Sequence, residues 1–280
     1  MTPTVSVIMA VYNSVAFLEE AVRSVQAQTL EAWELIVVDD GSTDGSFQTL
    51  EEMSAADSRI QLSRMPQNSG AGAARDYAIQ QARGSFIAIF DADDVCEPER
   101  FERQVEFLKA HSEIVAAGTQ TVRIDADGNP AGVKTFPTDP DELYRMMYVA
   151  VPIQLPTLMV HVALLPDNFD WFEGWRYSED SILFFKLAYY GKIANLPETL
   201  VKYRFYPEST FCRQVKTYFF ETWKARGIAR HRYGYKPSLR ARLTSGLQFV
   251  VVSCLPEALL PKIYELVRRF MLLLSGHDEK

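Results

Sequence analysis

Three short apolar runs, each followed by polar or acidic residues, constrain the fold of this chain more than any other feature. They occupy residues 5–11, 33–38 and 86–90 and are rich in Val, Ile and Phe. Runs of this length and composition predict strands that are buried on both faces. Such strands are typical of a parallel sheet that is covered by helices on both sides.

Helical patterns separate these runs and support the same architecture. After the first run, Leu18, Ala21, Val22 and Val25 recur at helical spacing. Further helices are expected around Phe47, Leu50 and Met53, from the loop at 69–72 to Ala82, and around Phe101, Val105 and Leu108, with a short strand at Ile60 and Leu62. Alternation of strands and helices predicts an α/β fold.

The second third of the chain is less regular. Residues 127–129 (DGN) are expected to form a hairpin turn. Helices are predicted at 143–149 and at 181–190, the second one ended by Gly191, and a late strand is predicted at 201–205.

Composition limits the class of protein. The 280 residues are 48% hydrophobic and 23% charged, which is typical of a globular chain with a large core. The apolar run near the N-terminus is short and no Lys or Arg precedes it, so no signal peptide is expected. No run approaches the roughly 18 apolar residues of a membrane span. The three cysteines fit neither a disulfide framework nor a zinc pattern, which favours the cytoplasm.

The net charge of −7 is unevenly distributed. Residues 211–280 contain 13 Lys and Arg against 5 Asp and Glu, whereas residues 1–210 contain 16 against 31. We therefore predict an acidic domain at 1–210 and a basic, amphipathic helical extension at 211–280. Basic charge confined to one end does not indicate a nucleic-acid partner, and none is expected.

Polar and acidic side chains follow the ends of the three predicted strands. They are Tyr12-Asn13, Asp39-Asp40 and Asp91-Ala92-Asp93-Asp94. In an open parallel sheet, ligands bind beyond the carboxyl ends of the strands. Clustered carboxylates repel one another unless a cation shares the site, and Mg²⁺ or Mn²⁺ prefers carboxylate and diphosphate oxygens. The sequence therefore predicts a site for a divalent cation and a diphosphate.

These motifs also have competing interpretations. A calcium-binding loop that starts at Asp91 would need Gly where the chain has Cys96. A dinucleotide-binding fingerprint that starts at Gly70 and Gly72 would need Gly where the chain has Arg75. Taken alone, residues 39–42 are equally well explained as a polar turn, and residues 125–128 are best explained as a turn.

Taken together, the motifs resemble those of the family 2 glycosyltransferases. The segments that carry the resemblance are 5–13 (VSVIMAVYN), 34–44 (ELIVVDDGSTD), 68–75 (NSGAGAAR), 90–94 (FDADD), 178–180 (SED) and 203–204 (YR). The resemblance covers roughly residues 4–210. It implies a GT-A fold, which is an α/β fold with a Rossmann-like, mostly parallel sheet sandwiched by helices, here followed by a helical C-terminal extension.

The resemblance implies roles for particular residues. The residues expected to bind the nucleotide are Ala10, Val11, Tyr12, Asp40, Arg75, Asp91 and Ala92. Asp91 and Asp93 would hold Mn²⁺ or Mg²⁺, with Asp93 as the direct ligand. Asp180 would be the general base that removes the proton from the acceptor hydroxyl. A UDP-sugar donor is expected because the Asp40 carboxylate can accept a hydrogen bond from the imide N–H of uracil, although dTDP and other donors stay open.

The resemblance also implies an inverting enzyme of polysaccharide or glycolipid synthesis that acts on a saccharide or lipid-linked acceptor. The donor would occupy residues 1–115 and the acceptor residues 116–210. Tyr206 stands where many relatives have His, so a non-catalytic scaffold of the same fold is one alternative. A sugar nucleotidyltransferase is another, but it would need a Gly-rich basic loop in place of residues 10–13 (AVYN). The sequence predicts no oligomeric state.

The basic extension has an apolar pattern of its own. Ile263, Leu266, Val267, Phe270, Met271 and Leu274 recur three and four residues apart. This pattern is consistent with peripheral contact at the cytoplasmic face of a membrane, and packing on the catalytic domain or a partner subunit is the alternative. Trp175 is a candidate for stacking on a sugar or for the core. Lys186 is a candidate for a solvated helix face or for a contact with acceptor or phosphate.

Overall fold

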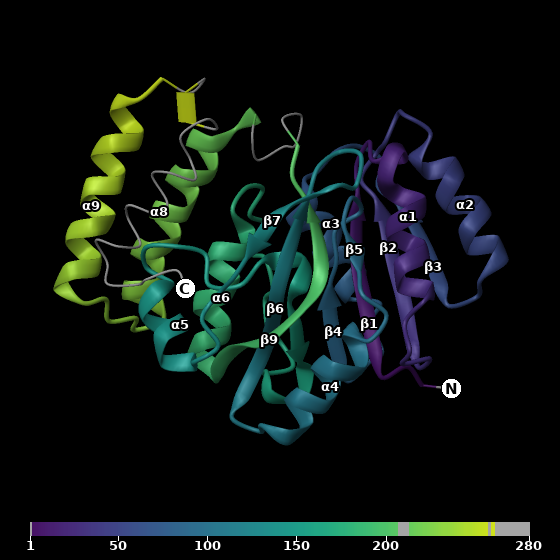
Figure 1. Cartoon of the computed structure of the whole chain (residues 1–280), viewed down its shortest axis with the longest axis horizontal. Helices are drawn as coiled ribbons and strands as arrows, with labels where there is room; N and C mark the ends of the chain where they lie inside the picture. Colours follow the sequence, from purple (N-terminus) through teal and green to yellow (C-terminus); the bar gives the residue numbers. More distant parts are fainter. Residues whose placement is uncertain (1, 207–212, 257–258, 261–280) are drawn as a thin grey trace.

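Helices cover both faces of a central sheet (Figure 1). The computed structural model describes residues 2–206, 213–256 and 259–260. The strands are β1 (Val5–Val11), β2 (Trp33–Asp39), β3 (Ile60–Arg64), β4 (Phe86–Ile89), β5 (Val95–Cys96), β6 (Ile114–Ile124), β7 (Pro130–Lys134), β8 (Met159–His161) and β9 (Lys192–Arg204). The helices are α1 (Val15–Gln26), α2 (Ser46–Ala56), α3 (Ala71–Ile79), α4 (Arg100–Ala110), α5 (Pro140–Met146), α6 (Glu179–Tyr190), α8 (Val215–Arg232) and α9 (Leu239–Cys254), with short 3₁₀ helices η1 (Leu155–Thr157) and η2 (Val162–Leu164).

The first half of the sheet is parallel and has the strand order β3-β2-β1-β4. β1 pairs with β2 in register from Val5 opposite Trp33 to Val11 opposite Asp39. Beyond the last pair, the Asp40 N–H donates to Val11 O at 2.8 Å. The residues that follow these strands therefore meet at one edge of the sheet. All three strands predicted from the apolar runs are present, within one residue of their expected bounds.

The second half of the sheet is mixed. β8 pairs antiparallel with β4 and β6, β9 runs parallel to β6, and β5 pairs antiparallel with β9. β9 begins at Lys192, well before the predicted start at residue 201. Its register with β6 shifts between the pairs Gly118–Asn195 and Gln120–Thr199. Pro197 lies in this irregular stretch, where a residue without an N–H is tolerated, and it interrupts the strand pattern in the sequence.

Two hydrophobic clusters lie on opposite faces of the sheet. Val7 and Met9 of β1 belong to the cluster formed with α1, α2 and α4. Ile8 belongs to the cluster formed with α3 and α6. Successive residues of a strand point to opposite faces, so the continuous apolar run of β1 supplies both clusters. The predicted α/β class, a mostly parallel sheet sandwiched by helices, is confirmed.

The C-terminal helix α8 lies beside α6, and α9 lies beside α8 (Figure 1). Arg226 of α8 is buried and donates to Ser245 Oγ at 2.9 Å and to Gln248 Oε1 at 2.8 Å. Gln248 in turn donates to Val149 O at 2.9 Å. Buried hydrogen bonds therefore hold these helices to the segment that follows α5. The predicted apolar pattern at 263–274 lies outside the described residues. Within the described ranges, no helix is long and apolar enough to cross a bilayer.

Candidate active site

A cavity of about 1020 Å³ lies where the parallel strands end. All of the predicted site residues line this cavity, namely Ala10, Val11, Tyr12, Asp40, Arg75, Asp91, Ala92, Asp93 and Asp180. They come from the ends of β1, β2 and β4, from α3 and from the first turn of α6. The structure thus brings the predicted set together, while the role of each residue stays a prediction.

The turns that follow β1 and β2 are fastened to each other. Asn13, with a φ of +51°, donates its N–H to Ser42 Oγ at 2.9 Å and accepts the Thr43 N–H on Oδ1 at 2.9 Å. Asn adopts positive φ more readily than most residues because its short side chain can hydrogen-bond locally. The turn after β2 is therefore more than a solvated polar turn, since it holds Asn13, which lines the cavity next to Tyr12.

Asp40 connects the end of β2 to the loop before α3. Its side chain is buried, and it accepts the Ser69 N–H on Oδ1 at 2.7 Å and the Gly70 N–H on Oδ2 at 2.8 Å. Gly70 has a φ of +97°, a conformation that favours glycine. Each carboxylate oxygen has two lone pairs, so Asp40 keeps acceptor capacity for a ligand.

Arg75 of α3 is buried between two carboxylates. Its Nη2 lies 2.7 Å from Asp91 Oδ1 and its Nη1 lies 2.5 Å from Glu179 Oε1. Burial alone lowers the pKa of Arg75, but the two carboxylates outweigh this effect and raise the pKa above its ordinary value. Arg75 therefore stays charged and joins the end of β4 to the start of α6.

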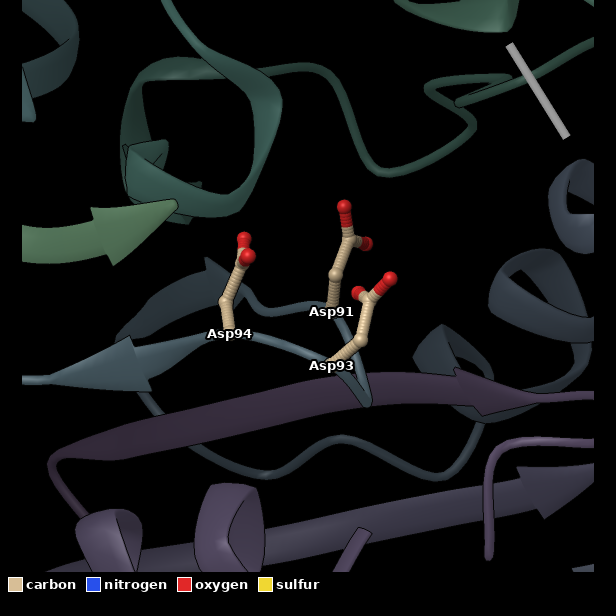
Figure 2. Close-up of side chains that lie close together, drawn as sticks. All are labelled: Asp91, Asp93 and Asp94. Carbon is tan, nitrogen blue, oxygen red and sulfur yellow. The ribbon is translucent and has the colours of Figure 1, made fainter. Parts of the chain in front are cut away.

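Asp91, Asp93 and Asp94 form a compact acidic cluster, with one carboxylate oxygen of each within 4.8 Å of the others (Figure 2). Asp94 is buried and accepts the Arg204 N–H on Oδ1 at 2.7 Å, and its Oδ2 has no hydrogen-bond partner among the described residues. Tyr206 Oη donates to Asp93 Oδ2 at 3.0 Å. A buried oxygen without a partner, beside two further carboxylates, fits a hard divalent cation such as Mg²⁺ or Mn²⁺.

The acidic cluster holds its carboxylates at an electrostatic cost. Burial raises the pKa of Asp93 to about 6, and the negative charge of Asp91 adds to this increase. Burial, together with its two acidic neighbours, also raises the pKa of Asp94 well above its ordinary value. Arg204 compensates only in part, because its Nε donates to the backbone oxygen of Asp93 and its Nη2 pairs with Glu20 at 2.6 Å. The cluster therefore favours binding of either a proton or a cation.

Asp180 lies in the first turn of α6, two residues after Ser178, which has a φ of +55°. Its Oδ1 accepts the Ser181 N–H at 2.7 Å. Ser178 Oγ lies 2.9 Å from Ser181 Oγ and 2.5 Å from Thr222 Oγ1, so α8 helps to fix this turn. Burial raises the pKa of Asp180, which makes its carboxylate a stronger proton acceptor than an exposed one.

Comparison with known families assigns the chain. The model described as "Glycosyl transferase family 2" matches residues 6–170, which is more than half of the chain. The chain belongs to glycosyltransferase family 2. A relative of this glycosyltransferase is the "Putative teichuronic acid biosynthesis glycosyltransferase TuaG" of Bacillus subtilis, 40% identical over 110 residues that make up 39% of this chain and 44% of TuaG. The chain thus spans less than half the length of this curated relative.

Solved structures of low sequence identity have the same fold as this glycosyltransferase. TarS of S. aureus, solved in complex with UDP-GlcNAc, has a TM-score of 0.72 and 20% identity, covering 98% of this chain and 88% of that chain. The mannosyltransferase PcManGT from Pyrobaculum calidifontis, solved with GDP-Man and Mn²⁺, has a TM-score of 0.59 and 16% identity, covering 99% and 86%. The predicted GT-A fold is confirmed.

The glycosyltransferase also has cavity residues that the sequence analysis did not single out. Tyr218, Thr222 and Arg226 of α8 line the cavity and stand four residues apart, on one face of the helix. The rings of Tyr218 and Tyr177 meet edge to face with centroids 5.6 Å apart. The sequence signal for this face is the spacing itself, because Tyr218, Thr222 and Arg226 recur every four residues in the basic extension.

Trp175 and Lys186 are each placed differently from one of the interpretations given for them above. Trp175 does not line the cavity, and Lys224 Nζ lies 4.8 Å from the centre of its ring. Lys186 is buried rather than solvated, and its Nζ forms an ion pair with Glu173 Oε1 at 3.2 Å. Both side chains connect the loop before α6 to its neighbouring helices in this family 2 enzyme, and neither offers its charge or ring to the cavity.

Proposed function

We propose that this family 2 enzyme transfers a sugar from a UDP-sugar to the hydroxyl of a saccharide or lipid-linked acceptor, with inversion, in the synthesis of a cell-surface polysaccharide or glycolipid. The observation that carries the proposal is the convergence of Asp40, Asp93 and Asp180 on one cavity. The names of two similar proteins support it, because TuaG is named for teichuronic acid biosynthesis and TarS was solved with UDP-GlcNAc.

The donor nucleotide is bound, in this proposal, at the ends of β1 and β2. Ala10, Val11 and Tyr12 form the wall beside the base and ribose, and Asp40 accepts a hydrogen bond from the base. Because both Asp40 oxygens already accept backbone N–H groups, the carboxylate is held in a fixed orientation before the nucleotide arrives. UDP is proposed over other nucleotides because uracil offers an imide N–H to an acceptor-only group.

The diphosphate is bound beside the acidic cluster. Asp93 and Asp91 hold Mn²⁺ or Mg²⁺, and the unpartnered Asp94 Oδ2 lies next to them. The bound cation supplies positive charge that stabilises the diphosphate as it leaves. Arg75 keeps Asp91 in place through its 2.7 Å ion pair and provides a fixed positive charge in the same wall of the cavity.

Asp180 is the proposed general base. It removes the proton from the acceptor hydroxyl while that oxygen bonds to the anomeric carbon and the bond between that carbon and the diphosphate breaks. The proton remains on Asp180 and the nucleoside diphosphate leaves from the opposite face, which gives inversion. The hydrogen bonds among Ser178, Ser181 and Thr222 keep the Asp180 turn in position.

A hydrolysis screen across nucleotide sugars tests the donor. With Mn²⁺ present and no acceptor, we expect slow release of UDP from at least one UDP-sugar and much less release from other nucleotide sugars. Preference for a donor with another base would contradict the assignment of UDP.

The variant Asp180→Asn tests the base. It should lower transfer or hydrolysis by about a hundredfold or more, because general-base catalysis contributes about 10²–10⁴-fold. Its affinity for UDP should stay within about twofold of the parent, since Asp180 is not expected to contact the nucleotide. The matched control is Asp167→Asn, which changes an exposed carboxylate outside the cavity lining and should keep full activity. Turnover that survives in Asp180→Asn would refute this role.

The cytoplasm is the proposed location. Cys96 and Cys254 are free thiols, which supports a reducing compartment, since disulfides persist mainly in oxidising ones.

A further inference from the structure

Helix α9 has a polar buried face and an apolar exposed face, the reverse of an ordinary surface helix. Its buried residues are Ala241, Thr244, Ser245, Gln248 and Val252. Its outer face carries the apolar residues Leu239, Leu243, Leu247 and Val250, whose exposed fractions are 73%, 67%, 42% and 57%. In a globular protein, the apolar stripe of a surface helix normally faces the core. The outer face of α9 therefore lacks the apolar environment that its composition favours.

The buried face of α9 explains why the helix cannot simply rotate to hide its leucines. Ser245 and Gln248 accept hydrogen bonds from the buried guanidinium of Arg226, and Gln248 also donates to Val149 O. Rotation would remove these partners from a buried charge, which is costly. The orientation of α9 is therefore set by polar contacts on the inside, and the leucines stay outside.

The apolar surface continues from α9 towards α8. Phe249 contacts Trp223 and Phe220 of α8, with ring centroids 4.7 Å and 5.7 Å away. Trp223 and Phe220 are themselves exposed. Several large apolar side chains exposed on one helix pair are typical of an interaction site.

The charge around this surface indicates the kind of partner. Residues 213–256 contain nine Lys and Arg, and Glu221 is their single acidic residue. The exposed basic residues of α8, α9 and their connection are Lys224, Arg230, Arg232, Lys236, Arg240 and Arg242, whereas Lys216 is partly buried. Apolar side chains bordered by Lys and Arg are the chemistry of a helix that lies on an anionic lipid surface. A second copy of the chain would instead bring two sets of like charges together.

We propose that the outer face of α9 docks on a leaflet that contains anionic lipid, with the helix lying in the plane of the interface. The opposite side of α9 contributes Gln248, Val251 and Val252 to the cavity wall. Docking would thus bring the cavity within about one helix diameter, roughly 10 Å, of the lipid surface. This short distance would give the cavity access to a lipid-linked acceptor. That consequence rests on the proposed function, whereas the binding of α9 to lipid does not.

Vesicle co-sedimentation of the full chain tests the docking. We expect binding to vesicles of phosphatidylcholine with about one third phosphatidylglycerol, and much weaker binding to phosphatidylcholine alone, because the basic residues add attraction to anionic lipid. Leu243→Glu should lower the partition coefficient by about tenfold or more, since it replaces an exposed apolar side chain, proposed to enter the lipid, with a charge. The matched control, Val133→Glu on β7, changes a side chain that is 64% exposed and should leave binding unchanged.

A charge variant and a sedimentation measurement of the oligomeric state complete the test. Arg242→Gln should weaken binding to the anionic vesicles by about fivefold and leave binding to neutral vesicles unchanged. Thermal unfolding of all three variants should match the parent, because each changes an exposed side chain.

Equal vesicle binding by parent and Leu243→Glu would overturn the proposal. So would a parent dimer that Leu243→Glu dissociates, because the outer face would then bind a second copy. Vesicle binding without any hydrolysis of nucleotide sugars would support the docking and count against the proposed function alone.

Discussion

At the residue scale, Arg75 determines how the acidic site is balanced. One guanidinium reaches Asp91 with one nitrogen and Glu179 with another, and all three side chains are wholly or partly buried. The planar fork of arginine allows this double contact, which a lysine could not reproduce. Arg75 thus connects the segment that follows β4 with the first turn of α6.

Arg75→Met should destabilise the fold by about 3 kcal/mol, because it leaves the buried carboxylate of Glu179 and the partly buried one of Asp91 without their partner. Adding Glu179→Gln should recover part of this loss, so that the double variant costs less than the sum of the single ones. The free energy of unfolding in urea gives all three values. Arg23→Met, which removes an exposed pair with Glu19, is the control and should cost less than about 1 kcal/mol. Additive costs of Arg75→Met and Glu179→Gln would contradict the bridge.

The sequence predicted which residues line the cavity better than it predicted their partners. Asp40, Asp93 and Asp180 follow recognisable motifs, so their positions could be inferred from order and spacing. Arg75 and Glu179 lie 104 residues apart, and no local pattern links them. Lys186 illustrates the same limit, because its ion partner lies in an irregular loop before the helix.

At the element scale, α3 and the loop before α6 are joined through a carboxylate in an unfavourable environment. Asp76 accepts the Phe172 N–H at 3.2 Å. Burial raises its pKa to about 6, and nearby Asp170 adds to the increase. The folded chain therefore binds more protons at Asp76 than the unfolded chain does between about pH 4 and pH 6, and this lowers stability as pH rises through that window.

Asp76→Asn should remove this pH dependence. Relative to the parent, the variant should gain about 1 kcal/mol of unfolding free energy between pH 5 and pH 7.5, because the buried charge is no longer formed. Urea unfolding at the two pH values measures the gain. Asp57→Asn is the control, since its ion pair with Arg59 lowers the pKa of Asp57 to about 2 and its effect should be constant over this range. Parallel pH profiles of Asp76→Asn and the parent would show that Asp76 is not buried in this way.

The elements that the sequence predicted well are the long, continuous ones. The runs of β1, β2 and β4 and the spacing within α1 fall on the observed elements because each buries a full face. β5 and β8 have only two and three residues, too few to produce a period. Their pairing depends on β9 and on β4 and β6, which lie far away in the sequence.

At the scale of the whole molecule, the described C-terminal helices complete the cavity as well as extending the chain. α8 supplies Tyr218, Thr222 and Arg226 to its wall, and α9 supplies Gln248. The charge division predicted an extension, but only the tertiary structure reveals that its inner side faces the site. The same two helices carry the apolar outer surface proposed to dock on lipid, so the site and that surface lie on opposite sides of one helix pair.

The central claim is that carboxylates at the strand ends bind a nucleoside diphosphate together with a divalent cation. Isothermal titration of the full chain with UDP, with and without Mn²⁺, tests it most directly, using the parent and Asp93→Asn. Mn²⁺ should tighten UDP binding to the parent by about tenfold or more, equivalent to about 1.4 kcal/mol. Asp93→Asn should lose this gain and keep the affinity measured without metal. UDP affinity that is the same with and without Mn²⁺, or a gain that survives in Asp93→Asn, would contradict the account.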